Sequence, residues 1–593
     1  MKKNLVTSLV EETFDSNSLN ILLGDWCNPS NSNSELFNHS EVFDYHWNDS
    51  KKIETDYSYL YSLHEKTIKH LTVQMNKIHQ ENQTERYWRI ILGPWVMCTI
   101  SILWDRWESL RLVFEKLNLN TCKHLNYETK NLITSDFFEF EKLRSEHDWN
   151  HIIFSEIIKF NYFSKIKVEI IEKKMKESIG KYTANYHNYS KTKIDYFMKF
   201  FDFLTKLLFR RSRIILYESY FGFFNKILLS FSLGESPRAF SEFREKITMP
   251  DPKERDDIKL EFQAKNEFEN FYKFFFFKLM PVSYLEGYKT LLAKSKKINR
   301  NAEIIFTATG HESNDFFKIW TANQVSGGTK YILCEHGGGW EKSEYFGNLE
   351  KTADLFLTWN QYDFKNSIQV PININLKKKK ILKKNIGSKI LLLSNSCGLY
   401  CNRLQTGPIA GQILKDYQLW KIFSQELSPQ IKQNLIFRPH PHDFWNLRKK
   451  YAMDFGEKHV SNKKKFEEDT KRSKVIIDTS FQTPFYQAMK IGIPTIILYD
   501  GKILNMDPKL SKLLNLFIKN KIFFDNSYEA SKHINEIWNN SLHWWNSKKV
   551  LEARNLFTEY CSIEKEDNFA YWKKLLNNQM NGQMNGQIND RHN

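Results

Sequence analysis

The spacing of hydrophobic positions changes along this chain of 593 residues. Across 56–78, apolar residues recur every three to four positions, which predicts an amphipathic helix. After residue 301 they form short, uninterrupted runs, as expected for strands buried on both faces of a parallel sheet. The second half of the chain therefore predicts alternating strands and helices.

Short apolar runs predict strands in three parts of the chain. These runs are 19–23 and 88–92, then 303–308, 331–334 and 354–358, and finally 389–394, 434–437, 474–478 and 494–499. Apolar strands separated by helix-length segments are typical of parallel α/β packing. We therefore predict two α/β series, the second of which begins after residue 388.

The stretch from about residue 105 to 300 lacks this alternation and is rich in aromatic residues. Between residues 196 and 231 alone, phenylalanine occurs at 197, 200, 201, 203, 209, 221, 223, 224 and 231. We interpret the stretch as a large helical insertion in the first series. Its aromatic density fits either a buried core or an amphipathic surface that contacts a membrane. We expect the buried core, which is the commoner arrangement.

These patterns predict an α/β fold of two Rossmann-type domains that face each other across a cleft. An N-terminal domain over 1–370 would contain the helical insertion, and a basic linker over 371–387 would lead to a C-terminal domain over 388–578. The Gln-Met-Asn-Gly repeats of 579–593 have no core-forming pattern, so we predict a disordered tail there.

The chain is strongly basic, with a formal net charge of +17 and a sequence pI of about 9.2. This balance attracts polyanions, among them phosphorylated donors, anionic lipid headgroups and nucleic acids. We expect no nucleic-acid partner, because the chain has no known binding motif and no basic stripe with interleaved aromatic residues.

Cysteine usage and the lack of targeting segments indicate a cytoplasmic protein. The seven cysteines are odd in number and form no CxxC pair, which fits a reducing compartment better than a disulfide framework. The N-terminus turns acidic before an apolar segment develops, and the longest uncharged run, 90–104, is too short to span a bilayer. The protein would be either free in the cytoplasm or peripheral on the inner face of the membrane.

The second series carries an Arg-Pro-His-Pro sequence directly after the predicted strand at 434–437. Ligands of parallel α/β sheets bind where strands end. The planar guanidinium of Arg438 matches phosphate oxygens, and His440 can donate a hydrogen bond to the same group. We predict that both residues bind the phosphates of a nucleotide.

A second candidate phosphate site follows the predicted strand at 474–478. Asp478 ends this strand, and Ser480 or Thr483 would cap the helix that comes next. Pro484 suits the first turn of that helix, whose free amides would bind an anion. Both strand ends could flank one diphosphate.

In the first series, Glu335, His336, Gly337 and Gly338 follow the predicted strand at 331–334. Glycines allow a ligand to approach the backbone closely, and the carboxylate and imidazole beside them could deprotonate a hydroxyl group. We therefore predict that this loop binds an acceptor, with His336 as a general base.

Other residues could serve as the base. His311 and Glu312 follow the strand at 303–308, and Asp25 follows the strand at 19–23. No Asp-x-Asp pair stands beside a predicted strand, so we expect neither a metal ion nor another cofactor. Arg438, His440 and a helix dipole would then neutralise the leaving phosphate.

Together these segments resemble the GT-B superfamily, in particular the CDP-glycerol glycerophosphotransferases and capsule polysaccharide transferases. Those families pair a His-Gly loop in the N-terminal domain with an Arg-Pro-His-Pro loop and a Ser/Thr-rich helix start in the C-terminal domain. A wider resemblance, carried by 23–27, 87–95 and 335–339, is to a bacterial transferase family found among surface-sugar biosynthesis genes. It covers nearly the whole chain.

The resemblance implies a metal-independent transferase that moves a sugar or polyol-phosphate group from a nucleotide-activated donor. CMP-, CDP- and UDP-linked donors all remain open. The acceptor would be a surface polysaccharide, such as capsule or lipopolysaccharide, or a glycolipid. The alternative is a non-catalytic GT-B-like scaffold of a polysaccharide assembly complex. The presence of His336 together with Arg438 and His440 favours the enzyme, because a scaffold needs no phosphate clamp.

Overall fold

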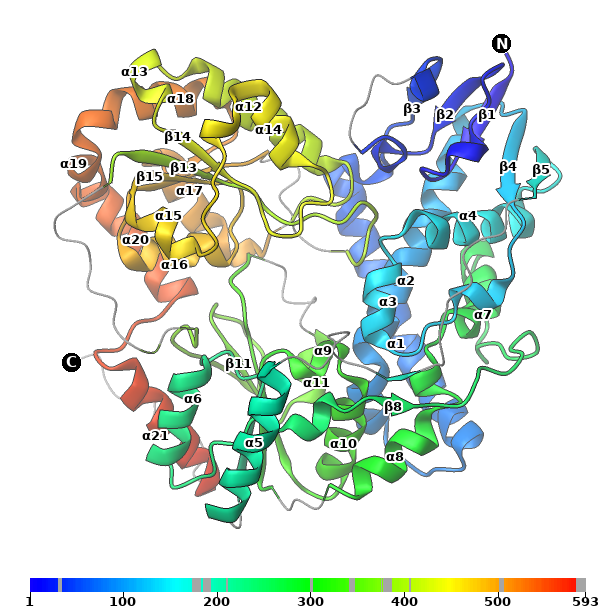
Figure 1. Ribbon diagram of the computed structural model, residues 1–593, viewed down its shortest axis with the longest axis horizontal. Coiled ribbons are helices and arrows are strands. Elements are labelled where there is room, and N and C mark those ends of the chain that lie inside the picture. Colours follow the sequence, from blue (N-terminus) through cyan, green and yellow to red (C-terminus); the bar gives the residue numbers. More distant parts are fainter. Residues whose placement is uncertain are drawn as a thin grey trace.

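Most of the chain is built around three parallel sheets of five strands each in a computed structural model (Figure 1). The structure describes residues 1–29, 35–172, 183–184, 193–208, 212–298, 302–340, 347–374, 376, 387–404, 407–500 and 506–582. Two of the sheets face each other across a cleft, which confirms the predicted GT-B-like arrangement. The third sheet, at the N-terminus, was not predicted.

The N-terminal sheet has the strand order β3-β2-β1-β4-β5. Its strands are β1 (Lys3–Val6), β2 (Leu19–Leu22), β3 (Ser40–Val42), β4 (Thr121–Leu125) and β5 (Lys167–Ile171). The strand predicted at 19–23 is thus confirmed as β2. Both β4 and β5 lie in the stretch that we interpreted as helical, so that stretch also supplies strands.

The middle sheet has the order β12-β11-β10-β9-β7. Its strands are β7 (Ile214–Tyr217), β9 (Ile304–Thr307), β10 (Lys330–Cys334), β11 (Leu355–Thr358) and β12 (Ser367–Gln369). Successive side chains point to opposite faces of a strand, so Ile304 and Phe306 join one core while Ile305 joins another. Burial on both faces explains why the predicted strands read as unbroken apolar runs.

The C-terminal sheet has the order β14-β13-β15-β16-β17. Its strands are β13 (Lys389–Leu393), β14 (Leu435–Arg438), β15 (Ser473–Asp478), β16 (Thr495–Leu498) and β17 (Phe523–Phe524). The four strands predicted after residue 388 are therefore confirmed. A separate antiparallel pair joins β6 (Thr183–Ala184) and β8 (Ile247–Thr248).

Two long helices, α1 (Ser50–His79) and α2 (Glu85–Lys116), connect the N-terminal and middle sheets (Figure 1). The strand predicted at 88–92 is wrong, because these residues lie in α2. An apolar run looks the same in a buried strand and in a helix that is buried all round. Gly93 fits there because a Cβ atom would lie 2.5 Å from the Asn348 side chain, and Pro94 stays within the helix.

Helix α2 is also the one helix among the described residues that is long and apolar enough to cross a bilayer. However, 83% of its most apolar stretch is buried inside the protein, as is typical of a core helix.

The remaining helices cover the sheets. The chain forms α3 (Phe137–Leu143) and α4 (His147–Asn161) between β4 and β5, and α5 (Lys193–Leu208) before β7. Between β7 and β9 it forms α6 (Phe223–Ser232), α7 (Glu267–Leu279) and α8 (Tyr288–Lys296). The middle sheet adds α9 (Gly310–Ser313), α10 (Asp315–Ser326) and α11 (Gly347–Thr352). The expectation of a buried aromatic core holds for α7 but is wrong for the outer faces of α5 and α6, which are exposed.

The C-terminal region is rich in helices. They are α12 (Gln412–Glu426), α13 (Pro429–Lys432), α14 (Leu447–Phe455), α15 (Phe466–Lys471), α16 (Thr483–Ile491), α17 (Ser511–Lys519), α18 (Ser527–Ile537), α19 (Ser541–Trp545), α20 (Lys548–Cys561) and α21 (Asn568–Met580). Helix α21 returns to the middle sheet, where the ring of Trp572 lies 4.9 Å from that of Phe221. The last helix thus packs outside the C-terminal domain in which we had placed it.

The predicted disordered tail starts too early, whereas most of the predicted linker lies outside the described residues. Gln579 and Met580 belong to α21 and are buried, so the predicted tail starts too early. The side chain of Gln579 accepts a hydrogen bond from Lys330 at 2.5 Å, which explains why this first Gln-Met unit is docked. Most of the predicted linker, and residues 583–593, lie outside the described residues.

Candidate functional site

The carboxyl ends of the middle and C-terminal sheets enclose a cavity of about 590 Å³. Nine predicted site residues line this central cavity: His311, Glu312, Glu335, His336, Gly337, Gly338, Arg438, His440 and Thr483. Asp25, Asp478 and Ser480 are not part of its lining. The rule that ligands bind at strand ends thus brings together most of the predicted residues.

His336 enters the cavity in a defined tautomer. Its Nδ1 atom lies 3.1 Å from the backbone carbonyl of Ala308. A carbonyl can only accept, so Nδ1 carries the hydrogen and the Nε2 atom of the neutral ring has a free lone pair. Nε2 is 4.0 Å from a carboxylate oxygen of Glu312. His336 is thus arranged to take up a proton next to a negative charge.

The charge states of His311 and Glu312 differ. Burial lowers the pKa of His311 to about 4, so this imidazole is neutral at pH 7. Burial alone would raise the pKa of Glu312, but interaction with a protonated His336 and with the guanidinium of Arg403 outweighs burial, and the pKa is lowered. Glu312 is therefore anionic. It can stabilise a protonated His336, whereas His311 is a poor base.

His440 has the opposite tautomer. The backbone N–H of His442 donates to His440 Nδ1 over 3.1 Å, so the hydrogen of the neutral ring is on Nε2. Burial lowers the pKa of His440, and the neighbouring His442 adds to this effect. The backbone N–H of His440 donates to Ser394 Oγ at 3.0 Å and fixes the loop. His440 is thus a neutral hydrogen-bond donor.

Arg438 is held by its own domain. Its guanidinium donates to Asp469 at 2.5 Å and to the backbone carbonyls of Lys463 and Lys464 at 2.9 and 3.2 Å. The side chain reaches the cavity lining, but its planar fork is engaged with a carboxylate. Arg438 therefore fixes the loop after β14 and adds positive charge to the cavity wall.

The glycines after His336 also have a packing role. A Cβ atom on Gly338 would lie 2.4 Å from the ring of Tyr486 in α16, and its backbone N–H donates to Thr483 Oγ1 at 3.1 Å. Trp340 stacks on Phe481 with ring centroids 3.7 Å apart. The glycines thus let the loop of the middle sheet pack directly on the C-terminal domain.

Glu335 is a structural residue by its contacts. Its side chain is buried, and its carboxylate accepts the backbone N–H of Trp359. This contact joins the ends of β10 and β11. His336 is therefore a better candidate base than Glu335.

The start of α16 differs from the prediction. Gln482 is the N-cap residue and makes no capping hydrogen bond with its side chain, so the caps predicted at Ser480 and Thr483 are wrong. Ser480 instead donates to Asn395 at 2.8 Å. Pro484 lies in the first turn, as predicted. The amides at the start of this helix still face the cavity lining, which includes Gln482, Thr483 and Pro484.

Asp478 and Asp25 lie outside the cavity lining. Asp478 is buried and accepts the backbone N–H groups of Thr479 and Ser480 at 2.7 and 3.2 Å. Burial raises its pKa to about 7. Asp25 packs against Gly411: a Cβ atom on Gly411 would lie 2.0 Å from the carboxylate of Asp25. Burial raises the pKa of Asp25. Both are packing residues in this geometry.

Residues 3–576 match the model of one protein family, described as LIC12162 family transferase. The chain belongs to this family. No curated protein matches the sequence of this LIC12162 family transferase.

Three solved structures are distantly similar to the LIC12162 family transferase. Alr3699/HepE from Anabaena, in complex with UDP and glucose, is 12% identical, covers 63% of this chain and 100% of its own, and has a TM-score of 0.34. The spinosyn rhamnosyltransferase SpnG (10%, 49% and 77%, 0.28) and WaaG, a glycosyltransferase involved in lipopolysaccharide biosynthesis (10%, 50% and 95%, 0.27), are similar over about half of the chain.

Several residues that line the cavity were not predicted from the sequence. Ser394, Asn395 and Ser396 line the cavity directly after β13, so their position at a strand end was a usable signal. Arg403 is ten residues beyond that strand and carried no such signal. It lines both the central cavity and a smaller one of about 70 Å³, which we call the side cavity.

The side cavity extends the central one towards α2 and α3. The two share His311, Glu312, Leu349 and Arg403. The side cavity also contains Glu141, Arg144 and apolar residues of α2, among them Pro94 and Met97. It thus combines charged groups with an apolar wall.

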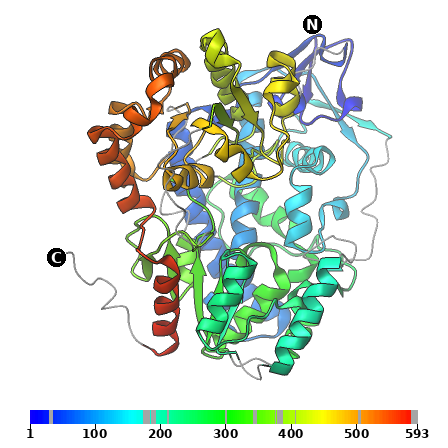
Figure 2. The same cartoon turned by 60° about the vertical axis from the view of Figure 1, so that its left-hand side comes forward.

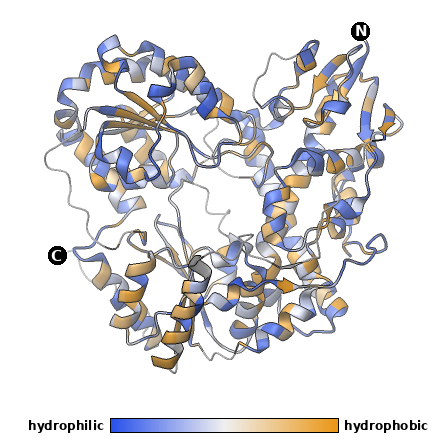
Figure 3. Ribbon diagram, in the orientation of Figure 1, coloured by the Kyte–Doolittle hydropathy of each residue, from blue (hydrophilic) through white to orange (hydrophobic). Residues whose placement is uncertain are grey.

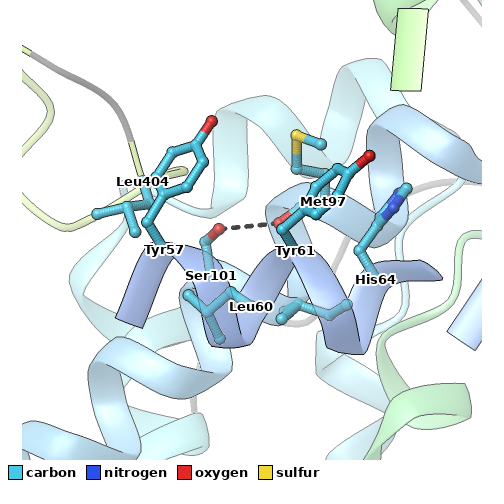
Figure 4. A pocket seen from close by; sticks show the side chains of 8 residues that line it. Tyr57, Leu60, Tyr61, His64, Met97, Ser101 and Leu404 are labelled. Atoms are coloured by element: carbon cyan, nitrogen blue, oxygen red, sulfur yellow. Dashed lines mark hydrogen bonds between the residues drawn. The ribbon is translucent and has the colours of Figure 1, made fainter. Parts of the chain in front are cut away.

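The other described parts of the chain contain no comparable ligand site. A pocket between α1 and α2, lined by Tyr61, His64 and Met97, holds only about 30 Å³ (Figure 4). That is too small for a nucleotide or a sugar. Among the described residues, no group of three or more His, Cys, Asp or Glu side chains is placed to hold a metal ion. All seven cysteines are buried and free.

Proposed function

We propose that the protein transfers a sugar or polyol-phosphate group from a nucleotide-activated donor to a hydroxyl group of a surface polysaccharide or glycolipid. Membership of a transferase family supports the reaction class. The observation that carries the proposal is the pair of opposite tautomers in one cavity: His336 offers a lone pair and His440 offers an N–H. CMP-, CDP- and UDP-linked donors are all candidates.

The proposed chemistry begins at His336. Its Nε2 lone pair accepts the proton of the acceptor hydroxyl as the acceptor oxygen bonds to the transferred group. The bond between that group and the donor's leaving phosphate oxygen breaks, and the electron pair stays on the phosphate. Glu312, 4.0 Å away, stabilises the imidazolium that forms.

The leaving phosphate would be bound by the C-terminal domain. His440 donates its Nε2 hydrogen to a phosphate oxygen, and the first turn of α16 presents the positive end of its helix dipole. Arg403 adds positive charge on the acceptor side of the same cavity. These groups act without a metal ion or another cofactor in our proposal, so EDTA should not inhibit the reaction.

We further propose that the acceptor binds in the central cavity beside His336. The side cavity next to it, with Glu141, Arg144 and an apolar wall, would accommodate only a small part of the acceptor. The protein would work in the cytoplasm, at least in part on the inner face of the membrane.

Nucleotide binding tests this proposal first. We would measure the melting temperature of the full chain with CMP, CDP, UDP, GDP and ADP, each with and without EDTA. A ligand at about 100 times its dissociation constant stabilises a protein by about 2.7 kcal/mol, which a melt detects easily. We expect stabilisation by one of the first three nucleotides. No response to any nucleotide would instead support the scaffold alternative.

Two substitutions separate the roles of the histidines. His440→Ala should weaken nucleotide binding about tenfold, whereas His442→Ala, which changes a side chain outside the cavity lining, should not. His336→Ala should leave nucleotide binding within about twofold and lower nucleotide release from the donor in the presence of acceptor by about 10²–10⁴-fold. Full activity of His336→Ala would remove it as the base.

A further inference from the structure

Helices α5 and α6 carry large apolar side chains on the outside of the protein. Both helices lie at the lower end of the molecule, and hydrophobic colours dominate them (Figures 2 and 3). We call their exposed side the aromatic face and define it by the following residues: Phe197, Phe200, Phe203, Leu207, Phe224 and Phe231. Each is more than half exposed, and Phe224 reaches 78%.

The two helices form one continuous surface. The Phe223 ring of α6 lies 6.3 Å from the Phe197 ring and 5.7 Å from the Phe201 ring of α5. An exposed apolar area of this kind on a soluble protein marks a binding surface. Single exposed aromatic residues would need no such explanation.

The inner side of α5 fixes the direction in which its aromatic residues point. Asp202 is only 2% exposed, and its carboxylate accepts the backbone N–H groups of Ala239, Phe240 and Ser241 at 2.6, 3.3 and 2.6 Å. Thr205, one turn further on, is also buried. A polar anchor therefore holds this helix with its apolar side outward.

Basic residues accompany the aromatic face. Lys199 is exposed within it, and α21, which packs against α6, exposes Lys573 and Lys574. The whole chain has a net charge of +17. Helices that combine aromatic and leucine side chains on one side with lysines beside them lie in the headgroup region of a bilayer. Anionic headgroups add an electrostatic attraction to each lysine.

We propose that the aromatic face docks on a bilayer that contains anionic phospholipids. It is also close to the central cavity, because Tyr220 precedes α6 by three residues, lines that cavity and has its ring 5.4 Å from His336. Docking therefore brings the part of the central cavity that contains Tyr220 and His336, the proposed base, towards the membrane. Resting on the proposed function, we infer that the acceptor is a lipid-linked glycan.

Vesicle binding tests the docking directly. The full chain is sedimented with vesicles of phosphatidylcholine alone and of phosphatidylcholine mixed with phosphatidylglycerol. We expect at least about tenfold stronger binding to the anionic vesicles. The triple variant Phe200→Ser, Phe203→Ser and Phe224→Ser should reduce this binding at least about tenfold, because three phenylalanines no longer enter the bilayer.

A matched control changes two exposed phenylalanines elsewhere, Phe274→Ser and Phe444→Ser. It should bind anionic vesicles within about twofold of the parent protein, and all variants should keep their melting temperature. Nucleotide stabilisation should be the same in all of them, so a failure of docking is separate from a failure of the proposed transfer.

Three outcomes would overturn the docking proposal. The parent protein could fail to bind anionic vesicles, or the triple variant could bind them as well as the parent. The parent could also self-associate in sedimentation velocity while the triple variant is monomeric and vesicle binding is absent, which would make the aromatic face an interface between copies of this chain.

Discussion

Helices α5 and α7 are both rich in phenylalanine, yet they differ completely in their surroundings. In α7, Phe271, Phe275 and Phe276 are at most 1% exposed. The Phe276 ring lies 4.9 Å from that of Trp95 in α2. In α5, by contrast, Phe200 and its neighbours on the aromatic face are mainly exposed. Aromatic content and helical spacing therefore do not determine burial.

The two helices are also held in place by different forces. Burial of aromatic surface between α2 and α7 stabilises α7. Helix α5 depends on the carboxylate of Asp202, which binds three backbone N–H groups of another segment. The hydrophobic side of a helix can thus either pack in the core of the protein or stay exposed as a surface for a partner. Substitutions can measure this difference.

The largest expected effect is in α7. Phe276→Ala should lower the free energy of unfolding by about 4 kcal/mol, because it leaves a cavity beside Trp95. Phe274, two residues earlier, is 40% exposed, and its replacement by alanine should cost less than about 1 kcal/mol. Denaturant unfolding of both variants checks this. Equal losses would mean that burial does not distinguish the two positions.

The next effect concerns the anchor of α5. Asp202→Ala should destabilise the protein by about 3 kcal/mol, since three buried or half-buried N–H groups lose a charged acceptor. The loss should be local, so hydrogen exchange should rise most in α5 and around residues 239–241. Asp202→Asn keeps one acceptor oxygen, so its free energy of unfolding should lie between those of the parent protein and Asp202→Ala. Unchanged exchange in α5 would show that its aromatic contacts with α6 suffice to hold it.

A third prediction uses the lysine of α6. The Nζ atom of Lys226 donates to the backbone carbonyl of Arg238 at 2.9 Å, and burial lowers its pKa to about 8. Between pH 8 and 10.5 the folded side chain is neutral while the unfolded one is still protonated, so stability should rise with pH. The parent should gain about 2 kcal/mol relative to Lys226→Met over this range. If the free energies of unfolding of the two proteins changed with pH in parallel, the lowered pKa of Lys226 would be contradicted.

The smallest expected effect is on the aromatic face. Phe200→Ser should change the free energy of unfolding by less than about 0.5 kcal/mol, because the ring is already mainly exposed. Binding of a hydrophobic dye should decrease. A loss comparable with that of Phe276→Ala would show that the face is covered in solution.

The sequence allowed much of the fold to be predicted because its central strands are buried on both faces. Strands such as β9 and β10 appear as unbroken apolar runs between turns. The prediction missed β4 and β5, which mix lysine with apolar residues; β4 has half-buried positions and β5 has exposed ones. It also assigned 88–92 to a strand, because a helix buried all round has no periodicity that identifies it.

For the site, the sequence predicted only which residues follow the carboxyl ends of strands. That rule located His336 and His440, because each follows a strand of a different sheet. It could not reveal that Arg438 pairs with Asp469 or that Gly338 meets Tyr486. These contacts join positions 31 and 148 residues apart. The first depends on the tertiary packing within the C-terminal domain and the second on how the two domains pack, which local patterns do not contain.

The close packing of Gly338 on α16 has a consequence for motion. Trp340 of the same loop stacks on Phe481, so this loop contacts the C-terminal domain at more than one position. A backbone contact that leaves no space for a Cβ atom cannot slide without a clash, so the loop restricts sliding of the two domains past each other. His336, two residues before Gly338, is therefore held next to α16, the helix that we propose receives the donor phosphate.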